Sequence, residues 1–370
     1  MPYRPRDIYR GRRKFRVPLT IFLFVLAFLL IGGVSLFFFL QRYLVYDANG
    51  VTLQLPSKTE QAEVEQMETL VTPKPTFEPV TVDIIWEDPD FSQIDLGGWE
   101  DLDAVQARFI PLDTVINANA LSSAVTAAQA EGYSGAVLEM KDDSGRLAWP
   151  SGASMAQSYG TAGPADVSAA IEALHEAGMT AAARISCFAD TLIAERNWPV
   201  ALQSGGSPYV DNDKRHWVDP YNRTVRTYLT ELALELAAMG FDEIILADLY
   251  HPVSEAGFTY STALQTQADP VAAVCQAGRR VVEALADTGV AVSAQIDADS
   301  LRNGQGSQTG QDINIFWRLF ARLYCPTSPD MAASDTELAV DAMNAGDGGI
   351  RFVPVCLYIP EGSPSYVITS

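Results

Sequence analysis

The sequence predicts an α/β protein in which a (β/α)8 TIM-like barrel follows an N-terminal transmembrane helix. Three observations support this prediction: an uncharged apolar run at residues 17–40, an alternation of strand-like and helical segments from residue 106 onward, and glycine at the ends of the helical segments. An open doubly wound sheet is the alternative for the same alternation. No G-x-G-x-x-G or G-x-x-x-x-G-K-[ST] motif follows the first strand, so the barrel is favoured.

The N-terminal region is typical of a single-pass membrane anchor. Residues 1–16 carry seven basic side chains and one acidic side chain, and residues 17–40 are 24 residues without a charge. About 20 apolar residues cross a bilayer, and basic residues stay on the cytoplasmic side. A cleaved signal peptide would have a shorter apolar region followed by small residues, which "FFFLQRYLVY" lacks. We therefore expect a cytoplasmic tail, a membrane-spanning helix at residues 17–40 and an extracytoplasmic body.

Two segments connect this anchor to the barrel. Residues 41–82 are predicted to be a juxtamembrane segment and a stalk, because their second part is rich in Glu, Gln, Thr, Lys and Pro. Residues 83–105 are predicted to be a lead-in, and we expect Ile84, Ile85 and Trp86 to pack near the side of the barrel that is left open after the seventh strand.

Strand-like and helical segments then alternate through residues 106–370. The expected strands are rich in apolar or β-branched residues and lie at 108–116, 135–142, 179–188, 242–250, 290–297, 318–326 and 352–359. The expected helices end in glycine and lie at 120–132, 163–178, 221–240 and 269–289. Only residues 360–370 follow the seventh strand, too few for the usual ending of a barrel. Either "SYVITS" returns as an eighth strand, or the barrel is open and incomplete at its C-terminus.

Charge and cysteine spacing exclude several classes of function. The net charge is −21 although the first 16 residues are basic, so the body is strongly acidic. A nucleic-acid ligand would need a basic surface and is therefore excluded. The four cysteines contain no C-x-x-C pair; they are Cys187, Cys275, Cys325 and Cys356. We expect buried thiols rather than disulfides or metal ligands, and we expect no cofactor.

Polar residues cluster where the expected strands end. In a (β/α)8 barrel these carboxyl ends meet at one face and carry the site. The residues collected there are Asp113, Asn117, Glu139, Lys141, Asp142, Asp143, Arg184, Asp190, Asp248, Tyr250, His251, Gln295, Asp297, Asp299 and Tyr324. Carboxylates dominate this set, so the sequence predicts an acidic rim.

Carboxylates with aromatic side chains favour chemistry on sugars. Glycosidic cleavage needs one protonated and one ionised carboxyl group, and we expect Asp248 as nucleophile and Asp297 as acid/base. The expected substrate-binding residues are Glu139, Lys141, Asp142, Asp143, Arg184, Trp217, Tyr250, His251 and Tyr324. A serine hydrolase is disfavoured because the G-x-S-x-G elbow is missing, and the three histidines show no metal spacing. A divalent-ion site at Asp142, Asp143 and Asp297 stays open as an alternative.

Several of these residues also have a structural interpretation. Asp142 and Asp143 precede Ser-Gly and are typical of a turn. Arg184 is a candidate partner for Glu139. Trp217 is a candidate core residue, and Asp219 before Pro220 is a candidate N-cap.

Four segments carry a resemblance to a known family: "VLEMKDDSGRL", "AARISCFADTLIAERNWPVAL", "HWVDPYNRTVRTYLTELALELAAMGFDEI" and "LYHP". They resemble a family of bacterial glycosyl hydrolase domains expected to be TIM barrels. The resemblance covers about residues 106–358, and the Lys-Asp-Asp-Ser-Gly and Trp-Val-Asp-Pro-Tyr motifs occur in the expected order. It implies a barrel fold and hydrolysis of glycans.

One position departs from that family. The family continues after "GFDEI" to an Asp that is expected to face the barrel mouth, where this chain has Ala247, and Asp248 follows one residue later. Side chains alternate along a strand, so this shift turns Asp248 away unless the backbone compensates. Two hypotheses remain: a hydrolase of a surface or cell-wall polysaccharide, or a non-catalytic carbohydrate-binding or envelope-organising protein on a degenerate barrel.

Overall fold

The computed structural model describes residues 44–47, 50–53, 102–254, 257–260, 269–303, 306–343 and 348–370. The chain divides into two compact units, residues 1–85 and residues 86–370. In the first unit, β1 (Leu44–Asp47) and β2 (Gly50–Leu53) pair as an antiparallel hairpin.

The predicted anchor and most of the predicted lead-in lie outside the part of the chain that the structure describes. This holds for residues 17–40 and for Ile84, Ile85 and Trp86. Within the described residues, no helix combines the length and the apolar character needed to cross a bilayer.

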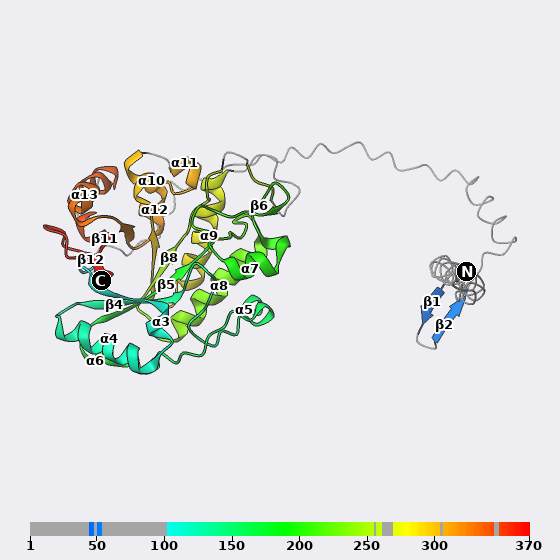
Figure 1. The fold of residues 1–370 in the computed structure, drawn as a ribbon, viewed down its shortest axis with the longest axis horizontal. Helices are drawn as coiled ribbons and strands as arrows, with labels where there is room; N and C mark the ends of the chain where they lie inside the picture. Colours follow the sequence, from blue (N-terminus) through cyan, green and yellow to red (C-terminus); the bar gives the residue numbers. More distant parts are fainter. Residues whose placement is uncertain are drawn as a thin grey trace, which may run out of the picture. The chain divides into compact units, whose positions relative to one another are not determined.

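The second unit is a closed barrel of eight parallel strands (Figure 1). In chain order they are β3 (Gln106–Ile110), β4 (Gly135–Lys141), β5 (Thr180–Ser186), β8 (Glu243–Ala247), β9 (Ala291–Gln295), β10 (Leu323–Pro326), β11 (Phe352–Cys356) and β12 (Tyr366–Ile368). The strand β12 is the predicted eighth strand, and it pairs with β11 at Val367–Val355 and with β3 at Tyr366–Gln106. The alternative of an open, incomplete barrel is therefore wrong. Residues 357–365 make the last crossover without a helix.

Helices surround the barrel and contribute the second layer of the fold. They are α3 (Leu112–Val115), α4 (Ala118–Ala130), α5 (Ser154–Tyr159), α6 (Ser168–Glu176), α7 (Thr191–Arg196), the 3-10 turn η2 (Trp198–Val200), α8 (Arg223–Ala238), α9 (Pro270–Leu285), α10 (Ala298–Asn303), α11 (Gly306–Thr309), α12 (Ile313–Leu319), α13 (Pro329–Met343) and α14 (Gly348–Arg351). A small hairpin of β6 (Gln203–Ser204) and β7 (Ser207–Pro208) extends from the connection between β5 and α8.

The start of α8 corrects one sequence-based expectation. The N-cap is Asn222, whose Oδ1 accepts a hydrogen bond from Thr224 N at 2.8 Å. Asp219 is fully buried and its carboxylate instead accepts from Tyr221 N at 2.9 Å. Pro220 therefore lies in a turn before the helix rather than at its first position, since helix geometry begins only at Arg223.

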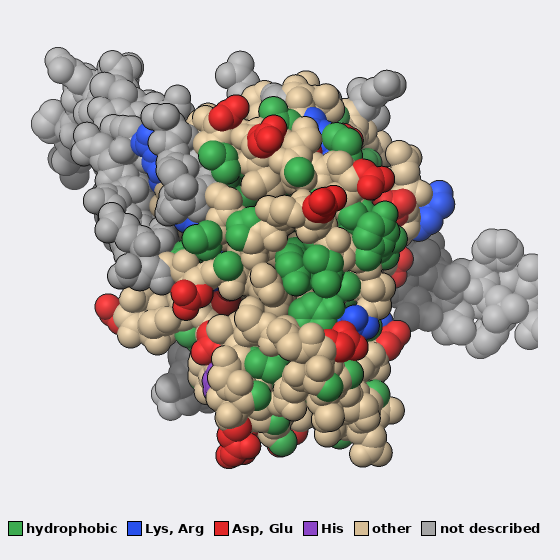
Figure 2. Space-filling view, turned by 90° about the vertical axis from the view of Figure 1, so that its left-hand side faces the viewer, with side chains coloured by type: hydrophobic (Ala, Val, Ile, Leu, Met, Phe, Trp, Pro, Cys, Tyr) green, Lys and Arg blue, Asp and Glu red, His purple; other side chains and the backbone are tan. Residues whose placement is uncertain are grey.

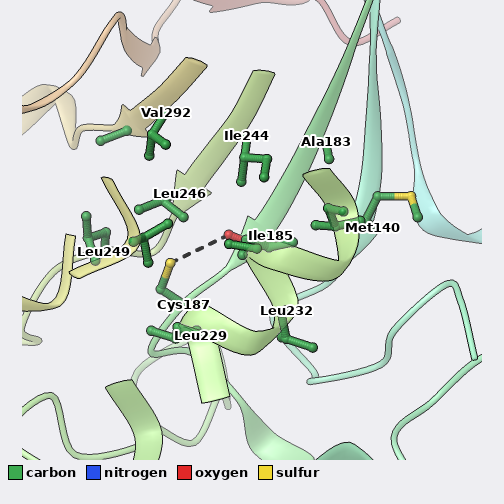
Figure 3. Packing of buried hydrophobic residues seen from close by; sticks show 14 of the residues in the cluster. Met140, Ala183, Ile185, Cys187, Leu229, Leu232, Ile244, Leu246, Leu249 and Val292 are labelled. Carbon is green, nitrogen blue, oxygen red and sulfur yellow. Dashed lines mark hydrogen bonds between the residues drawn. The ribbon is translucent and has the colours of Figure 1, made fainter. Parts of the chain in front are cut away.

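Two apolar layers stabilise the barrel because successive strand residues face opposite sides. One set faces the helices, where Ile185, Leu246 and Leu232 pack together (Figure 3). The other set fills the barrel interior and includes Val137, Ile245 and Tyr324. Burying such side chains contributes roughly 1.5–3 kcal/mol each, so the two layers account for most of the stability of the fold.

The four cysteines are buried and none is bonded to another, as the sequence predicts. Cys187 packs among the residues of Figure 3, and its Sγ lies 3.8 Å from Ile185 O. Burial raises the pKa of these thiols, so they remain protonated and behave as small apolar side chains.

The surface agrees with the acidic composition. On the face drawn in Figure 2, acidic side chains are scattered over the surface and Lys and Arg are few.

Candidate functional site

The first part of the site is a set of three polar side chains. They point into the barrel at the carboxyl ends of their strands. Glu139 on β4 accepts a hydrogen bond from Arg184 Nη1 on β5 at 2.8 Å, and Leu112 N donates to its other oxygen at 3.0 Å. Arg184 Nε also donates to Gln295 Oε1 on β9 at 3.2 Å. The pairing of Arg184 with Glu139 that the sequence suggested is therefore present. Arg184 thereby connects β4, β5 and β9 at the barrel mouth, and β8 lies between β5 and β9 in the sheet.

These side chains form one wall of a pocket of about 250 Å³. Most of the other lining residues are apolar, and the full set is Phe109, Val137, Glu139, Arg184, Ile245, Gln295, Tyr324, Pro326, Val355, Val367 and Thr369. Sites for drug-sized ligands usually enclose about 300–1,000 Å³, so this pocket suits a smaller ligand. Burial raises the pKa of Glu139, although the adjacent Arg184 guanidinium opposes the shift.

Asp248 reaches the same mouth through an unusual backbone conformation. Ala247 is the last residue of β8, is buried and pairs with Ser186. Asp248 follows with φ +49°, in the left-handed region that Asp tolerates better than most residues. Its carboxylate thereby accepts a hydrogen bond from Ser186 Oγ at 2.7 Å and lies 3.9 Å from Arg184 Nη2. The backbone thus compensates for the one-residue shift.

Arg215 joins Asp248 to a second carboxylate. Its Nη1 lies 3.4 Å from Asp248 Oδ1 and 3.8 Å from Asp143 Oδ2, so these two oxygens are at most about 7 Å apart. Arg215 is held by Asp211, whose Oδ2 accepts from Nε at 2.8 Å, and by the ring of Trp217 at 5.3 Å. Arg215 could not be picked out from the sequence, because it lies in a long connection rather than directly after a strand.

The local environment raises the pKa of both Asp143 and Tyr250. Desolvation raises the pKa of Asp143, and the nearby Asp248 raises it further, while Arg215 opposes the shift. Burial, followed by the same Asp248 charge, raises the pKa of Tyr250 to about 12. Tyr250 is partly exposed, and its hydroxyl lies 3.4 Å from Arg215 Nη2. Asp143, whose pKa is raised, therefore shares Arg215 with Asp248, and Asp248 has donors from Ser186, Arg184 and Arg215 around its oxygens.

A bulge in β4 removes Lys141 from the mouth. The pairing with β5 shifts between Glu139 and Lys141, so Lys141 no longer shares the inward face of Glu139. Its side chain is fully buried and donates to Ser186 O at 2.7 Å, beside Asp190 at 3.0 Å. In this position Lys141, which the sequence suggested as a substrate-binding residue, is not among the residues that line the pocket.

Asp142 holds a turn, which agrees with the structural interpretation of this stretch. It accepts from Ser144 Oγ at 2.6 Å and from Arg146 N at 2.9 Å, and Arg146 Nη1 also reaches Asp113 at 3.0 Å. The turn directs the half-exposed Asp143 toward Arg215. Asp142 itself is mostly buried and has its oxygens occupied within the turn.

Three expected substrate-binding aromatic or histidine side chains are buried. Trp217 donates from Nε1 to Asp211 at 3.0 Å and packs on Tyr250, so it supports the site from behind. His251 is hydrogen-bonded to Pro252 O at 2.7 Å inside an aromatic cluster, and burial lowers its pKa. Tyr324 lines the pocket floor, but its hydroxyl donates away from the pocket to Glu243 at 3.0 Å. Each of these three side chains is buried because it packs and hydrogen-bonds with other parts of the protein.

Asp297 is exposed and directly precedes α10. Its Oδ2 accepts from Ser300 N at 2.9 Å, which is the interaction of a helix N-cap. Asp143, rather than Asp297, shares the Arg215 guanidinium with Asp248. Among the described residues, no three His, Cys, Asp or Glu side chains are arranged to hold a metal ion.

Comparisons with known proteins point to glycoside hydrolases. The sequence profile of the family described as "Putative glycosyl hydrolase domain" matches residues 107–318. The glycoside hydrolase domain of PgaB (BpsB) from Bordetella bronchiseptica is 12% identical with a TM-score of 0.54, over 72% of this chain and 94% of that one. A hypothetical protein from Ruminiclostridium thermocellum is 23% identical with a TM-score of 0.44, over 50% of this chain and 96% of its own. No significantly similar sequence was found among curated proteins.

Proposed function

Since the chain belongs to this family of glycosyl hydrolase domains, we propose that its barrel hydrolyses glycosidic bonds in a polysaccharide or oligosaccharide. The observation that carries the proposal is the arrangement of Asp143 and Asp248 around the Arg215 guanidinium. Arg184 connects this arrangement to the pocket, because it lines the pocket and its Nη2 lies 3.9 Å from Asp248 Oδ2.

The two carboxyl groups have environments suited to different roles. Asp143 takes the role of general acid, because burial and the nearby Asp248 raise its pKa, which is the direction that favours the protonated form. Asp248 takes the role of the partner carboxylate, because Ser186 Oγ donates a hydrogen bond to it and Arg184 and Arg215 form ion pairs with it. Asp143 therefore takes the acid role that the sequence analysis gave to Asp297.

The pocket has the composition expected for one sugar ring. Glu139, Arg184 and Gln295 offer acceptors and donors to hydroxyl groups, while Phe109 and Val355 offer apolar contact to the ring's C–H face. Retaining glycosidases separate the two carboxyl groups by about 5–5.5 Å and inverting ones by about 6.5–9.5 Å. The upper limit of about 7 Å between the Asp143 and Asp248 oxygens is compatible with either class.

A non-catalytic carbohydrate-binding protein is the second candidate. It is favoured by Ala247 at the position of the family's carboxylate, and by the ion pairs and hydrogen bond that engage both oxygens of Asp248. A carboxylate held in this way binds a sugar hydroxyl without carrying out chemistry.

Hydrolysis of a panel of surface and cell-wall polysaccharides distinguishes the two functions. We expect the wild-type protein to release reducing ends from at least one polymer, and Asp143→Asn and Asp248→Asn to lower the rate by about 10²–10⁴-fold. Ser293→Ala is a matched control, since it removes a buried hydroxyl elsewhere in the barrel. Binding to these polymers without release of reducing ends would support the second candidate.

The proposed location follows from the sequence of residues 17–40. An uncharged span behind a basic head would anchor the chain with its N-terminus in the cytoplasm and the barrel outside. The substrate would then be a surface or cell-wall polysaccharide.

A further inference from the structure

Ser186, the last residue of β5, lies between two hydrogen-bond acceptors. Its Oγ is 2.7 Å from Asp248 Oδ2 and 2.9 Å from Ala189 O. The Ser186 side chain is fully buried. A hydroxyl group has one hydrogen to donate, so it serves one of these acceptors at a time.

The surrounding structure holds the backbone of Ser186 in place. Lys141 Nζ donates to Ser186 O at 2.7 Å and is itself paired with the buried Asp190 at 3.0 Å. Among the described residues, Ser186 is the donor that reaches Ala189 O. The hydroxyl can therefore turn between its two acceptors while the serine backbone stays in place.

The two orientations match the two protonation states of Asp248. When Asp248 is ionised, the hydroxyl donates to its Oδ2. When Oδ2 carries a proton, that proton is donated to Ser186 Oγ, and the hydroxyl hydrogen turns to Ala189 O. The carboxyl group has a hydrogen-bond partner in both states. A buried carboxyl group without a partner would cost free energy.

We propose that Ser186 is a positioning residue whose hydroxyl changes acceptor as Asp248 gains and loses a proton, so that Asp248 acts as a general base. This inference rests on the proposed hydrolase function and deepens it. A water oxygen bonds to the anomeric carbon as the glycosidic C–O bond breaks. Asp143 gives its proton to the leaving oxygen, and Asp248 takes a proton from the water. Both carboxyl groups return to their starting states by exchange with solvent, and the anomeric configuration is inverted.

Other charged and titratable groups face Asp248 from each neighbouring element. They are Asp143 after β4, Arg184 on β5, Cys187 directly after β5, Arg215 before α8, and Tyr250 after β8. The test must therefore follow Asp248 and Ala189 individually rather than a bulk titration.

Nuclear magnetic resonance of the full-length protein provides that test. Labelling with ¹³C′-alanine and ¹⁵N-aspartate selects Ala-Asp peptide bonds, among them Ala189–Asp190, and ¹³Cγ-aspartate reports the carboxyl group of Asp248. Ala189→Gly and Asp248→Asn assign the two signals. As pH falls, we expect the Ala189 carbonyl signal to move downfield with the same midpoint as the Asp248 carboxyl signal.

The variant Ser186→Ala should abolish the movement of the Ala189 signal. Ser293→Ala, which removes a hydroxyl bonded to the Glu243 carboxylate, should leave both signals as in the wild type. A purely structural serine would not couple the Ala189 signal to Asp248.

The outcomes separate this inference from the proposed function. An Ala189 signal that stays constant in the wild type, or that still moves in Ser186→Ala, overturns the role of Ser186. Coupled signals in a protein that hydrolyses no glycan support the hydroxyl switch and count against the proposed function. Hydrolysis with retained configuration, followed by ¹H spectra of the released sugar, overturns the assignment of Asp248 as a base.

Discussion

Replacing Lys141 with methionine removes one half of an ion pair that the fold encloses completely. Lys141 Nζ lies 3.0 Å from Asp190 Oδ2, and the two side chains are 0% and 1% exposed. Methionine keeps the length of the side chain without its charge. Asp190 would still accept from Ile193 N at 2.9 Å, but its charge would be buried without a counterion. Removing one partner of a buried pair costs about 3–5 kcal/mol.

That loss is large enough to measure in the whole protein. For a domain of this size, 1 kcal/mol shifts Tm by roughly 2–4 °C, so Lys141→Met should lower Tm by about 6–20 °C. Thermal and urea unfolding followed by circular dichroism would measure the change.

A double-mutant cycle isolates the ion pair. Asp190→Asn alone leaves Lys141 charged and unpaired, while asparagine keeps the N-cap of α7. The double variant Lys141→Met/Asp190→Asn should recover much of the lost stability, because no buried charge remains. A Lys141→Met variant within about 1 kcal/mol of the wild type would refute this reasoning, since the pair would then contribute like an exposed one.

Three further predictions concern chemistry, packing and topology. Because the pKa of Asp143 is raised, kcat/KM should fall as pH rises through that pKa, and this alkaline limb should be missing from residual Asp143→Asn activity. A Cβ at Gly278 would lie 2.5 Å from Phe320 Cζ, so urea unfolding should show Gly278→Ala to be about 1–3 kcal/mol less stable; an unchanged midpoint would show that Phe320 moves freely. Protease added to intact cells should digest the barrel if residues 17–40 span the membrane with the N-terminus inside; protection would contradict that orientation.

The barrel could be predicted from the sequence because its signals are local. Apolar strand segments and glycine-terminated helices repeat along the chain, and even the short "SYVITS" is the strand that closes the barrel. The long helix α13 (Pro329–Met343) was not predicted, since Ala, Asp and Ser dominate its sequence and its apolar periodicity is weak.

The site was less predictable because it depends on two local backbone irregularities. Strict alternation would place Lys141 with Glu139 at the mouth and turn Asp248 away. A bulge in β4 directs the buried Lys141 side chain away from the barrel mouth, and the positive φ of Asp248 directs its carboxylate toward the mouth. Neither feature has a clear sequence signature. Arg215 was missed for a different reason, because tertiary contacts with Asp211 and Trp217 bring a connecting segment to the site.

The rates of Asp143→Asn and Asp248→Asn on glycosides with two different leaving groups test the central claim most directly. A dinitrophenolate leaving group departs without a proton, whereas the alkoxide of a natural glycoside needs one. Asp143→Asn should therefore lose about 10²–10⁴-fold on the natural polymer but stay within about tenfold of the wild type on matching 2,4-dinitrophenyl glycosides. Asp248→Asn should be impaired on both. Equal losses for Asp143→Asn on the two substrates, or an unimpaired Asp248→Asn, would contradict the assigned carboxylate pair.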